Sequence, residues 1–373
     1  MIAKFRSIFP SFSRIYIDLN RWQRFNYIRF MRQVMAECTD ATIDDISILY
    51  RSEKYVVVNK RYDVLINSEE ETHTNPMFGN IDVAKQLFHV MPEVADPKLE
   101  HHFRFVHRLD FATSGVLCLG LKRKAAGKAA IKFQQRLVTK HYSALVRNTV
   151  YRLDERSELT ISAAIGRDKT EDARHIMTTA DNPNCESPRP CKTKMVLLET
   201  GKYDGEPASK VLLIPETGRT HQLRVHCRHV GHQIVGDYAY SNRTDVKPYR
   251  MMLHAFRLVI PLQNEHIDVV APDPFTPETD KLWQPDKVVR TYDDYVKDQD
   301  FKKTLSSGKK TSPGRKPKHR NIRDGTTSSA PCTTGDFDGA TNTAVSVTGD
   351  SNRSSNSGPS AGHGASQTPI VKM

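Results

Sequence analysis

Short runs of β-branched and aromatic residues, separated by polar turns, dominate the middle of the chain and predict β-strands. The runs 46–50 and 55–58 flank the polar segment 51–54, a pattern typical of a β-hairpin. Residues 115–121 form an uninterrupted apolar run of the length expected for a buried strand. Similar runs predict further strands at 141–146, 195–198, 211–214, 251–260 and 267–270.

Two segments show helical spacing of their apolar residues instead. Residues 124–137 combine good helix formers with Phe133 and Leu137 on one face. Residues 219–230 form a second candidate helix, and Gly231 directly after it is a common helix terminator. Because strands and helices do not alternate regularly, as they would in a doubly wound parallel sheet, the sequence predicts an α+β fold.

Both ends of the chain differ in composition from this ordered pattern. Residues 1–34 carry seven Lys or Arg but a single Asp, which is typical of a mitochondrial transit peptide. The alternatives are a mobile basic leader and upstream sequence read through before a start at Met35. Residues 302–323 hold nine Lys or Arg and no acid, and residues 324–373 are mostly Ser, Thr, Gly, Asn and Ala. Such segments bury too little apolar surface to offset the entropy of ordering, so we expect disorder there.

This composition predicts a leader at 1–41, a single folded domain at 42–300 and a tail at 301–373. The 373-residue chain has a net charge of +12, but the basic flanks carry the excess and the central region is close to neutral. The net charge therefore does not by itself indicate a nucleic-acid partner. No run of eighteen apolar residues occurs, so we expect no membrane-spanning helix. The six scattered cysteines indicate free thiols in a reducing compartment.

Asp110 is the main candidate for chemistry. Residues 101–150 contain ten Lys or Arg, and Asp110 is their only Asp or Glu. So many neighbouring cations favour the ionised carboxylate. The polar segment around Asp110 leads directly into the apolar run at 115–121, and a nucleophile is expected on such a loop, supported by a rigid strand. A salt bridge that tethers a turn is the structural alternative.

Several other motifs are incomplete. The Gly115-x4-Gly120 pair lacks the G-K-[ST] ending of a phosphate-binding loop, and no D-F-G follows the H-R-L-D sequence as it would in a kinase. No second carboxylate lies near Asp110 in the sequence for a glycosidase. The histidines around Cys227 match no zinc motif and are bracketed by arginines, so we predict no metal site. These histidines are His221, His226, His229 and His232.

The second polar cluster lies in the candidate helix at 219–230. Helical spacing places His221, Arg224 and Arg228 on one face. A solvated basic helix face is the simple interpretation. The unpartnered carboxylate of Asp110 favours instead a pairing with this cationic face.

Four motifs, in this order, resemble those of the RluA-type pseudouridine synthases. They are H-R-L-D-x-x-T-S-G at 107–115, K-x-Y-x-A at 140–144, G-R-T-H-Q-L-R-V-H at 218–226 and L-H-A at 253–255. The third continues into G-H-x-I-V-G-D-x-x-Y at 231–240, with Gln233 where the family usually has Pro. The early N-K-P-x-G motif of the family reads Asn59-Lys60-Arg61-Tyr62-Asp63 here, a departure that bears on substrate specificity.

The resemblance implies a catalytic domain built on a mixed, largely antiparallel, bent sheet flanked by helices. It also implies isomerisation of uridine to pseudouridine in RNA, by base flipping and an aspartate-dependent break of the glycosidic bond, without a metal or cofactor. The implied catalytic residues are Asp110, Tyr142 and Arg224. Arg224 would pair with Asp110, and Tyr142 would stack near the uracil and remove the C5 proton. Arg108 would displace the base, and the residues expected to contact substrate or RNA are Arg108, His107, Thr113, Arg219, His221 and Gln222.

The implied partner is RNA, through uridines of tRNA, rRNA or mRNA, and the cations of residues 101–150 are suited to contact its phosphates. We expect no membrane association, no obligate protein partner and a monomer. The expected location is cytoplasmic or nuclear, with the mitochondrion as the alternative because of the Arg-rich N-terminus. The alternative function is a non-catalytic RNA-binding protein that retains the synthase fold.

Overall fold

The computed structural model describes residues 41–68, 81–150, 157–170 and 176–308, and the structural statements below concern these residues. All of them belong to one compact unit. The predictions for residues 1–40 and for the tail beyond residue 308 lie outside the described residues. Within the described part of the chain, no helix is long and apolar enough to cross a membrane.

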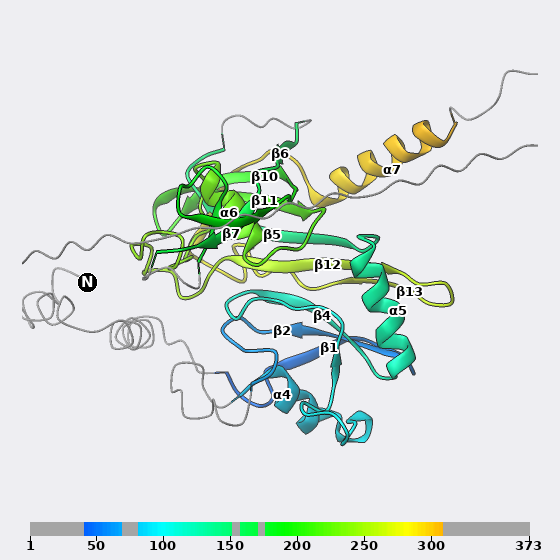
Figure 1. The fold of residues 1–373 in the computed structure, drawn as a ribbon. Coiled ribbons are helices and arrows are strands. Elements are labelled where there is room, and N and C mark those ends of the chain that lie inside the picture. The colour runs from blue at the N-terminus through cyan, green and yellow to red at the C-terminus, as the bar shows by residue number, and fades with distance from the viewer. Residues whose placement is uncertain (1–40, 69–80, 151–156, 171–175, 309–373) are drawn as a thin grey trace, which may run out of the picture. The chain divides into compact units, whose positions relative to one another are not determined.

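A large mixed sheet forms the body of the fold (Figure 1). Its main strands, in spatial order, are β1 (Ile46–Arg51), β2 (Tyr55–Lys60), β4 (Ser114–Gly120), β12 (Leu253–Pro261), β5 (Thr139–Arg147), β11 (Glu206–Pro215), β10 (Thr193–Tyr203) and β14 (Trp283–Val288). Only β4 and β12 run parallel in this order. Register shifts typical of β-bulges interrupt several of the strand pairs, and such bulges bend a sheet. The predicted α+β fold with a mixed, largely antiparallel sheet is confirmed.

Smaller elements complete the described fold. The large sheet also contains β13 (His266–Val270) on β12, β3 (Arg104–Phe105) on β4 and β6 (Leu159–Ile161) on β10. A separate three-stranded sheet has the order β8 (Met177–Thr179), β7 (Ile165–Asp168) and β9 (Cys185–Arg189). The helices are α4 (Val83–Val90), the 3-10 turn η2 (Pro92–Val94), α5 (Arg123–Gln134), α6 (Gln222–His229) and α7 (Tyr292–Gly308).

The helix α7 continues to Gly308, past the domain end that the sequence predicts at residue 300. Two of its side chains, Gln299 and Lys302, contact the Glu158 carboxylate at 2.9 and 3.9 Å. These contacts tie the middle of the helix to Glu158, which composition alone does not reveal.

Alternate residues of β4 face two different helices. Val116 and Cys118 pack in the hydrophobic cluster that includes Ala129 of α5. Leu117 and Leu119 point to the opposite face, where they pack in the cluster that α4 covers. The two helices therefore lie on opposite faces of this part of the sheet.

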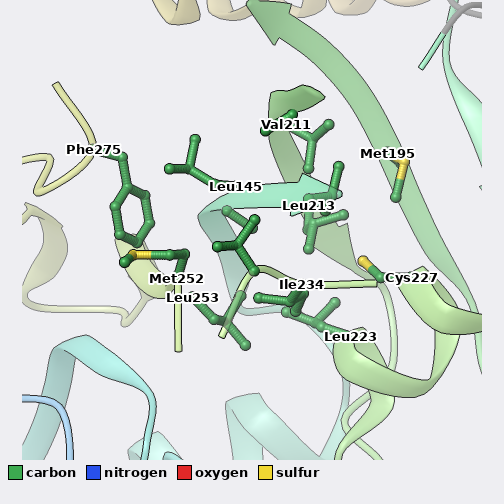
Figure 2. Packing of buried hydrophobic residues seen from close by; sticks show 14 of the residues in the cluster. Leu145, Met195, Val211, Leu213, Leu223, Cys227, Ile234, Met252, Leu253 and Phe275 are labelled. Atoms are coloured by element: carbon green, nitrogen blue, oxygen red, sulfur yellow. The ribbon is translucent and has the colours of Figure 1, made fainter. Parts of the chain in front are cut away.

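The largest core cluster joins α6 to the strands β5, β10 and β11 (Figure 2). Leu223 and Cys227 of α6 lie in this cluster with Met195, Leu213 and Ile234. Burial of these side chains stabilises the contact by about 25 cal/mol per Å² of apolar surface. This packing fixes the rotation of α6 about its axis and hence the direction of its polar side chains.

Candidate active site

Asp110 lies in the loop between β3 and β4, and its side chain is 33% exposed. The loop closes as a turn in which the Thr113 N–H donates to the Asp110 carbonyl oxygen at 3.1 Å. The strand β4 begins with the next residue, Ser114. Asp110 thus stands on a short loop that a buried strand supports, where the sequence predicts it.

Two buried basic side chains hold the segment that follows Asp110. Lys60, at the end of β2, donates from Nζ to the Phe111 carbonyl at 2.9 Å and to two carbonyls of the turn that follows β2. Arg250 donates from Nη2 to the hydroxyl of Ser114, which also bonds Nδ1 of His254 at 2.8 Å. Lys60 and Arg250 are only 1% and 3% exposed, so water does not compete for these bonds. The loop that carries Asp110 is therefore held in one place.

The turn that departs from the family motif belongs to the same scaffold. Tyr62 lies against the Arg250 guanidinium, with 4.4 Å between the ring centroid and Cζ. Asp63 has a left-handed backbone with φ 54°, the conformation that glycine adopts most easily. The Arg61-Tyr62-Asp63 turn therefore keeps a glycine-like backbone without glycine and adds a contact to Arg250.

Arg224, on α6, joins Asp110 to a second carboxylate. Its Nη1 lies 3.7 Å from Oδ2 of Asp110, while its Nε and Nη2 each donate to Asp237 at 2.7 Å. Burial alone lowers the pKa of this guanidinium, but Asp237 and then Asp110 outweigh burial, so the net pKa is raised and the charge is kept. Sequence reasoning paired Arg224 with Asp110 but missed Asp237. The signal was present, because Asp237 is the only acid in the motif at 231–240.

His221 directly precedes α6 and has a left-handed backbone, with φ 53° and ψ 20°. Its Nε2 lies 4.0 Å from Oδ2 of Asp110, and its Nδ1 lies 2.9 Å from the Tyr240 hydroxyl. The Tyr240 ring also packs against Arg224, with 4.7 Å between the ring centroid and Cζ. Burial and then the charge of Arg224 lower the pKa of His221, so the imidazole is neutral at pH 7.

Tyr142, on β5, packs in the cluster on the α4 side of the sheet. It is the register partner of Ala255 on β12, which is in turn the partner of Gly115 on β4. Gly115 permits this close pairing, because a Cβ there would lie 2.2 Å from the Ala255 carbonyl oxygen. Burial and then the charge of Asp110 raise the pKa of Tyr142, so its phenol keeps the proton at neutral pH.

The remaining residues predicted to contact RNA fall into two groups. Arg108 is exposed, and Arg219 lies at the surface, where it reaches a backbone carbonyl at 3.4 Å. Thr113, His107 and Gln222 are turned into the protein instead; Thr113, for example, is only 2% exposed.

The partners of the inward residues show what they do. His107 accepts a hydrogen bond from the Cys118 N–H at 2.9 Å and stacks on Phe133 of α5, and burial lowers its pKa to about 3. The Gln222 carbonyl oxygen accepts from the Thr217 hydroxyl at 2.7 Å. These side chains support the fold around the loop, so we do not assign them to RNA contacts.

Within the described ranges, no group of three or more His, Cys, Asp or Glu side chains is arranged to hold a metal ion. The histidines near Cys227 have other partners; His226 Nδ1, for example, lies 2.8 Å from the Thr193 hydroxyl. The described site combines a carboxylate, a guanidinium, an imidazole and a phenol. Such a set is suited to nucleophilic and acid–base chemistry.

Comparison with known proteins places this fold and site in a family. A sequence profile described as RNA pseudouridylate synthase matches residues 54–229. The chain is 50% identical over 257 residues to RNA pseudouridylate synthase domain-containing protein 1 of Danio rerio. The aligned region covers 69% of this chain and 84% of the relative. It is 44% identical over 291 residues to the Homo sapiens protein of that name, and the aligned region covers 77% of this chain and 86% of the relative.

A more distant relative and a solved structure agree. The chain is 31% identical over 248 residues to tRNA pseudouridine synthase C of Yersinia pestis. The aligned region covers 64% of this chain and 88% of the relative. The solved structure of human RNA pseudouridylate synthase domain containing 1 matches with a TM-score of 0.59 at 40% identity, over 75% of this chain and 100% of that chain. The chain therefore belongs to the RNA pseudouridylate synthase family, and the family predicted from the four motifs is confirmed.

Proposed function

We propose that this protein is an RNA pseudouridine synthase, which converts uridines of an RNA to pseudouridines. The observation that carries the proposal is the placement of the Asp110 carboxylate 3.7 Å from an Arg224 guanidinium whose orientation Asp237 fixes. Membership of the family supports it. The relatives described as tRNA pseudouridine synthase C favour tRNA as the substrate class over rRNA and mRNA.

The proposed reaction is an isomerisation that balances without a co-reactant. The N1–C1′ bond of uridine breaks and a C5–C1′ bond forms, while the C5 hydrogen leaves as a proton and N1 gains a proton. Asp110 either attacks C1′ and forms an ester, or stabilises the positive charge on the sugar and removes a proton from it. In both routes Asp110 acts as a carboxylate that the Arg224 guanidinium orients.

Tyr142 is proposed to stack on the uracil and to take the C5 proton. Before the reaction its burial and the charge of Asp110 keep the phenol protonated. Once Asp110 has bonded to the sugar or taken a proton, its negative charge is gone, and one of the two causes that raise the pKa of Tyr142 disappears. Proton removal by Tyr142 therefore belongs to the late part of the reaction, after Asp110 has reacted.

A uridine stacked in RNA reaches this site only when it is flipped out, which costs on the order of a few kcal/mol. Arg108 is exposed two positions before Asp110 and has no ion-pair partner among the described residues. We propose that Arg108 displaces the base and fills the gap in the stack, and that Arg219 contacts phosphate. Lys124 and Lys128 stand on α5, on the face of the sheet opposite Tyr142, so we assign the substrate contacts to the first two arginines.

The proposal is tested with the full-length protein and the Asp110→Asn variant on RNA from cells that lack the protein, followed by pseudouridine-specific chemical mapping. Wild type should form pseudouridine at defined uridines. Asp110→Asn should lose at least ~10³-fold in rate and still bind the same RNA, because the change removes the reacting group but little of the binding surface. Asp181→Asn, which alters an exposed carboxylate, is the matched control and should keep full activity.

Two outcomes would count against the proposal. Full activity of Asp110→Asn contradicts the aspartate-dependent mechanism. RNA binding without any pseudouridine from wild type indicates the alternative function, a non-catalytic RNA-binding protein with the synthase fold.

A further inference from the structure

The imidazole of His221 lies in the site, and the proposed reaction gives it no role. It enters the site from a left-handed backbone position, which is unfavourable for a residue with a side chain. Its Nε2 faces Oδ2 of Asp110 at 4.0 Å, too far for a hydrogen bond between the two groups. The imidazole therefore faces the Asp110 carboxylate but is not hydrogen-bonded to it.

The partner of the other ring nitrogen fixes where the proton of His221 sits. Tyr240 is 1% exposed, and its hydroxyl oxygen accepts a hydrogen bond from the Met177 N–H at 2.9 Å. Burial raises the pKa of Tyr240, so the phenol keeps its proton and must donate it to an acceptor. His221 Nδ1, at 2.9 Å, is that acceptor among the described residues. The imidazole proton then lies on Nε2, the nitrogen that faces Asp110.

Burial and three charged groups set the electrostatic state of this imidazole. Burial and the guanidinium of Arg224 lower its pKa, whereas the carboxylates of Asp110 and Asp237 raise it less, and the net result is a lowered pKa. His221 is therefore a neutral hydrogen-bond donor at pH 7. A neutral donor does not neutralise the negative charge of Asp110. A cationic imidazole would form an ion pair with that carboxylate and make it less reactive.

We propose that the Nε2–H of His221 binds a carbonyl oxygen of the uracil and stabilises the negative charge that the base gains when the N1–C1′ bond breaks. This proposal rests on the proposed pseudouridine synthase function and assigns a catalytic role to a residue that the sequence motif placed only among the RNA contacts. The leaving uracil is an anion whose charge is shared between N1 and its two carbonyl oxygens. A fixed donor that meets this charge lowers the barrier of the cleavage step.

The distances allow this contact. A carboxylate oxygen poised to react lies about 3 to 3.5 Å from the atom it attacks. The O2 carbonyl of the uracil is bonded next to N1, on the same side of the ring as C1′. A donor 4.0 Å from the attacking oxygen is therefore close enough to reach O2 when Asp110 is in contact with C1′.

The test compares two leaving groups. Fluorine at C5 withdraws electrons and makes the uracil anion more stable, so 5-fluorouridine needs less help from a donor. We would measure single-turnover loss of the nucleoside from tRNA transcripts that contain uridine or 5-fluorouridine, with wild type and His221→Phe. On uridine the variant should lose ~10²-fold or more in the maximal rate of cleavage, with little change in the enzyme concentration that gives half of that rate. On 5-fluorouridine the loss should be at least about tenfold smaller.

Two further variants separate this role from a structural one. His221→Gln keeps an N–H donor and should recover part of the rate that His221→Phe loses. His229→Phe changes an exposed histidine of the same helix and should behave as wild type on both RNAs. An equal loss for His221→Phe on the two RNAs, or no loss on either, overturns the proposal. If wild type forms no pseudouridine at all, the proposed function itself has failed, which is a distinct result.

Discussion

Asp237 accepts two hydrogen bonds from Arg224, one from Nε and one from Nη2, and leaves Nη1 of the same guanidinium facing Asp110. Asp237 is 1% exposed, so the pair lies in a region of low dielectric where the partner of a charge cannot be replaced by water. A single arginine thus connects a buried carboxylate to the partly exposed carboxylate of Asp110.

The first prediction concerns Asp237→Asn. The change removes the negative charge that compensates the buried Arg224 guanidinium and breaks its fixed orientation. We expect the free energy of unfolding to fall by roughly 3 kcal/mol, since one partner of a buried pair is lost. We also expect a lower rate of pseudouridine formation, because Asp110 loses an oriented partner. Urea unfolding and single-turnover assays measure the two effects.

The control for Asp237→Asn is Asp268→Asn on β13. Asp268 also binds an arginine with both carboxylate oxygens, at 2.6 and 2.7 Å from Arg257, but it is 33% exposed and lies on β13, which contributes no residue to the site. Its loss should cost less than about 1 kcal/mol and leave the rate unchanged. Similar effects of the two changes would show that Arg224 needs no buried anchor.

The second prediction concerns which cations bind RNA. Arg108→Ala should weaken binding and reduce the slope of log Kd against log salt by about one unit, because one phosphate or base contact is lost. The double change of Lys124 and Lys128 to Ala, on the opposite face of the sheet, should leave both quantities almost unchanged. Filter binding at several salt concentrations measures them. If the double change on α5 has the larger effect, the RNA follows the α5 face instead.

The third prediction is a dependence of stability on pH that originates at Lys60. The pKa of Lys60 is lowered from 10.5 to about 7, and burial is the largest cause of this shift. In the unfolded chain the pKa keeps its ordinary value. Between these two pH values the unfolded chain binds a proton that the folded chain has lost, so the free energy of unfolding rises with pH, by at most about 1.4 kcal/mol per pH unit. Below pH 7 both states hold the proton, and this contribution is constant.

Urea unfolding of wild type and Lys60→Met at several pH values between about 7 and 10 measures this effect. The variant lacks the titrating group, so the difference between the two proteins should grow in favour of wild type as the pH rises. At every pH Lys60→Met should be the less stable, because three carbonyl oxygens lose their donor. Lys281→Met, at an exposed position, is the control. A difference that stays constant with pH would contradict the buried titration.

The sequence predicts those parts of the fold that have strong local patterns. The hairpin of β1 and β2, the strand β4 and the helix α5 appear close to their predicted positions, because β-branched runs and helical spacing mark them directly. The helix α6 starts at Gln222 rather than Arg219, because His221 adopts a left-handed backbone. The short helix α4 is missed although Asp82 caps its first turn, because the helix is only eight residues long. The edge strand β14 has no alternating apolar pattern, and its pairing with β10 forms it.

For the site, sequence reasoning found Asp110 and Arg224 and their proximity. It assigned His107 and Gln222 to RNA contacts, whereas these side chains bond within the protein. A motif records which residues belong together but not the direction in which each side chain points. That direction depends on strand register and helix packing, as the inward position of His107 between β4 and α5 shows.

The position of β12 has a consequence for the synthesis of this protein. β4 and β5 follow one another in the chain, joined by α5, yet β12 lies between them in the sheet. Until residues 253–261 leave the ribosome, the facing edges of β4 and β5 have no strand between them. A nascent chain that already carries Asp110 and Tyr142 therefore holds two unpaired apolar edges, the kind of surface that chaperones protect. The candidate active site is completed only near the end of translation of the folded region, so truncation before β12 should yield an aggregating product.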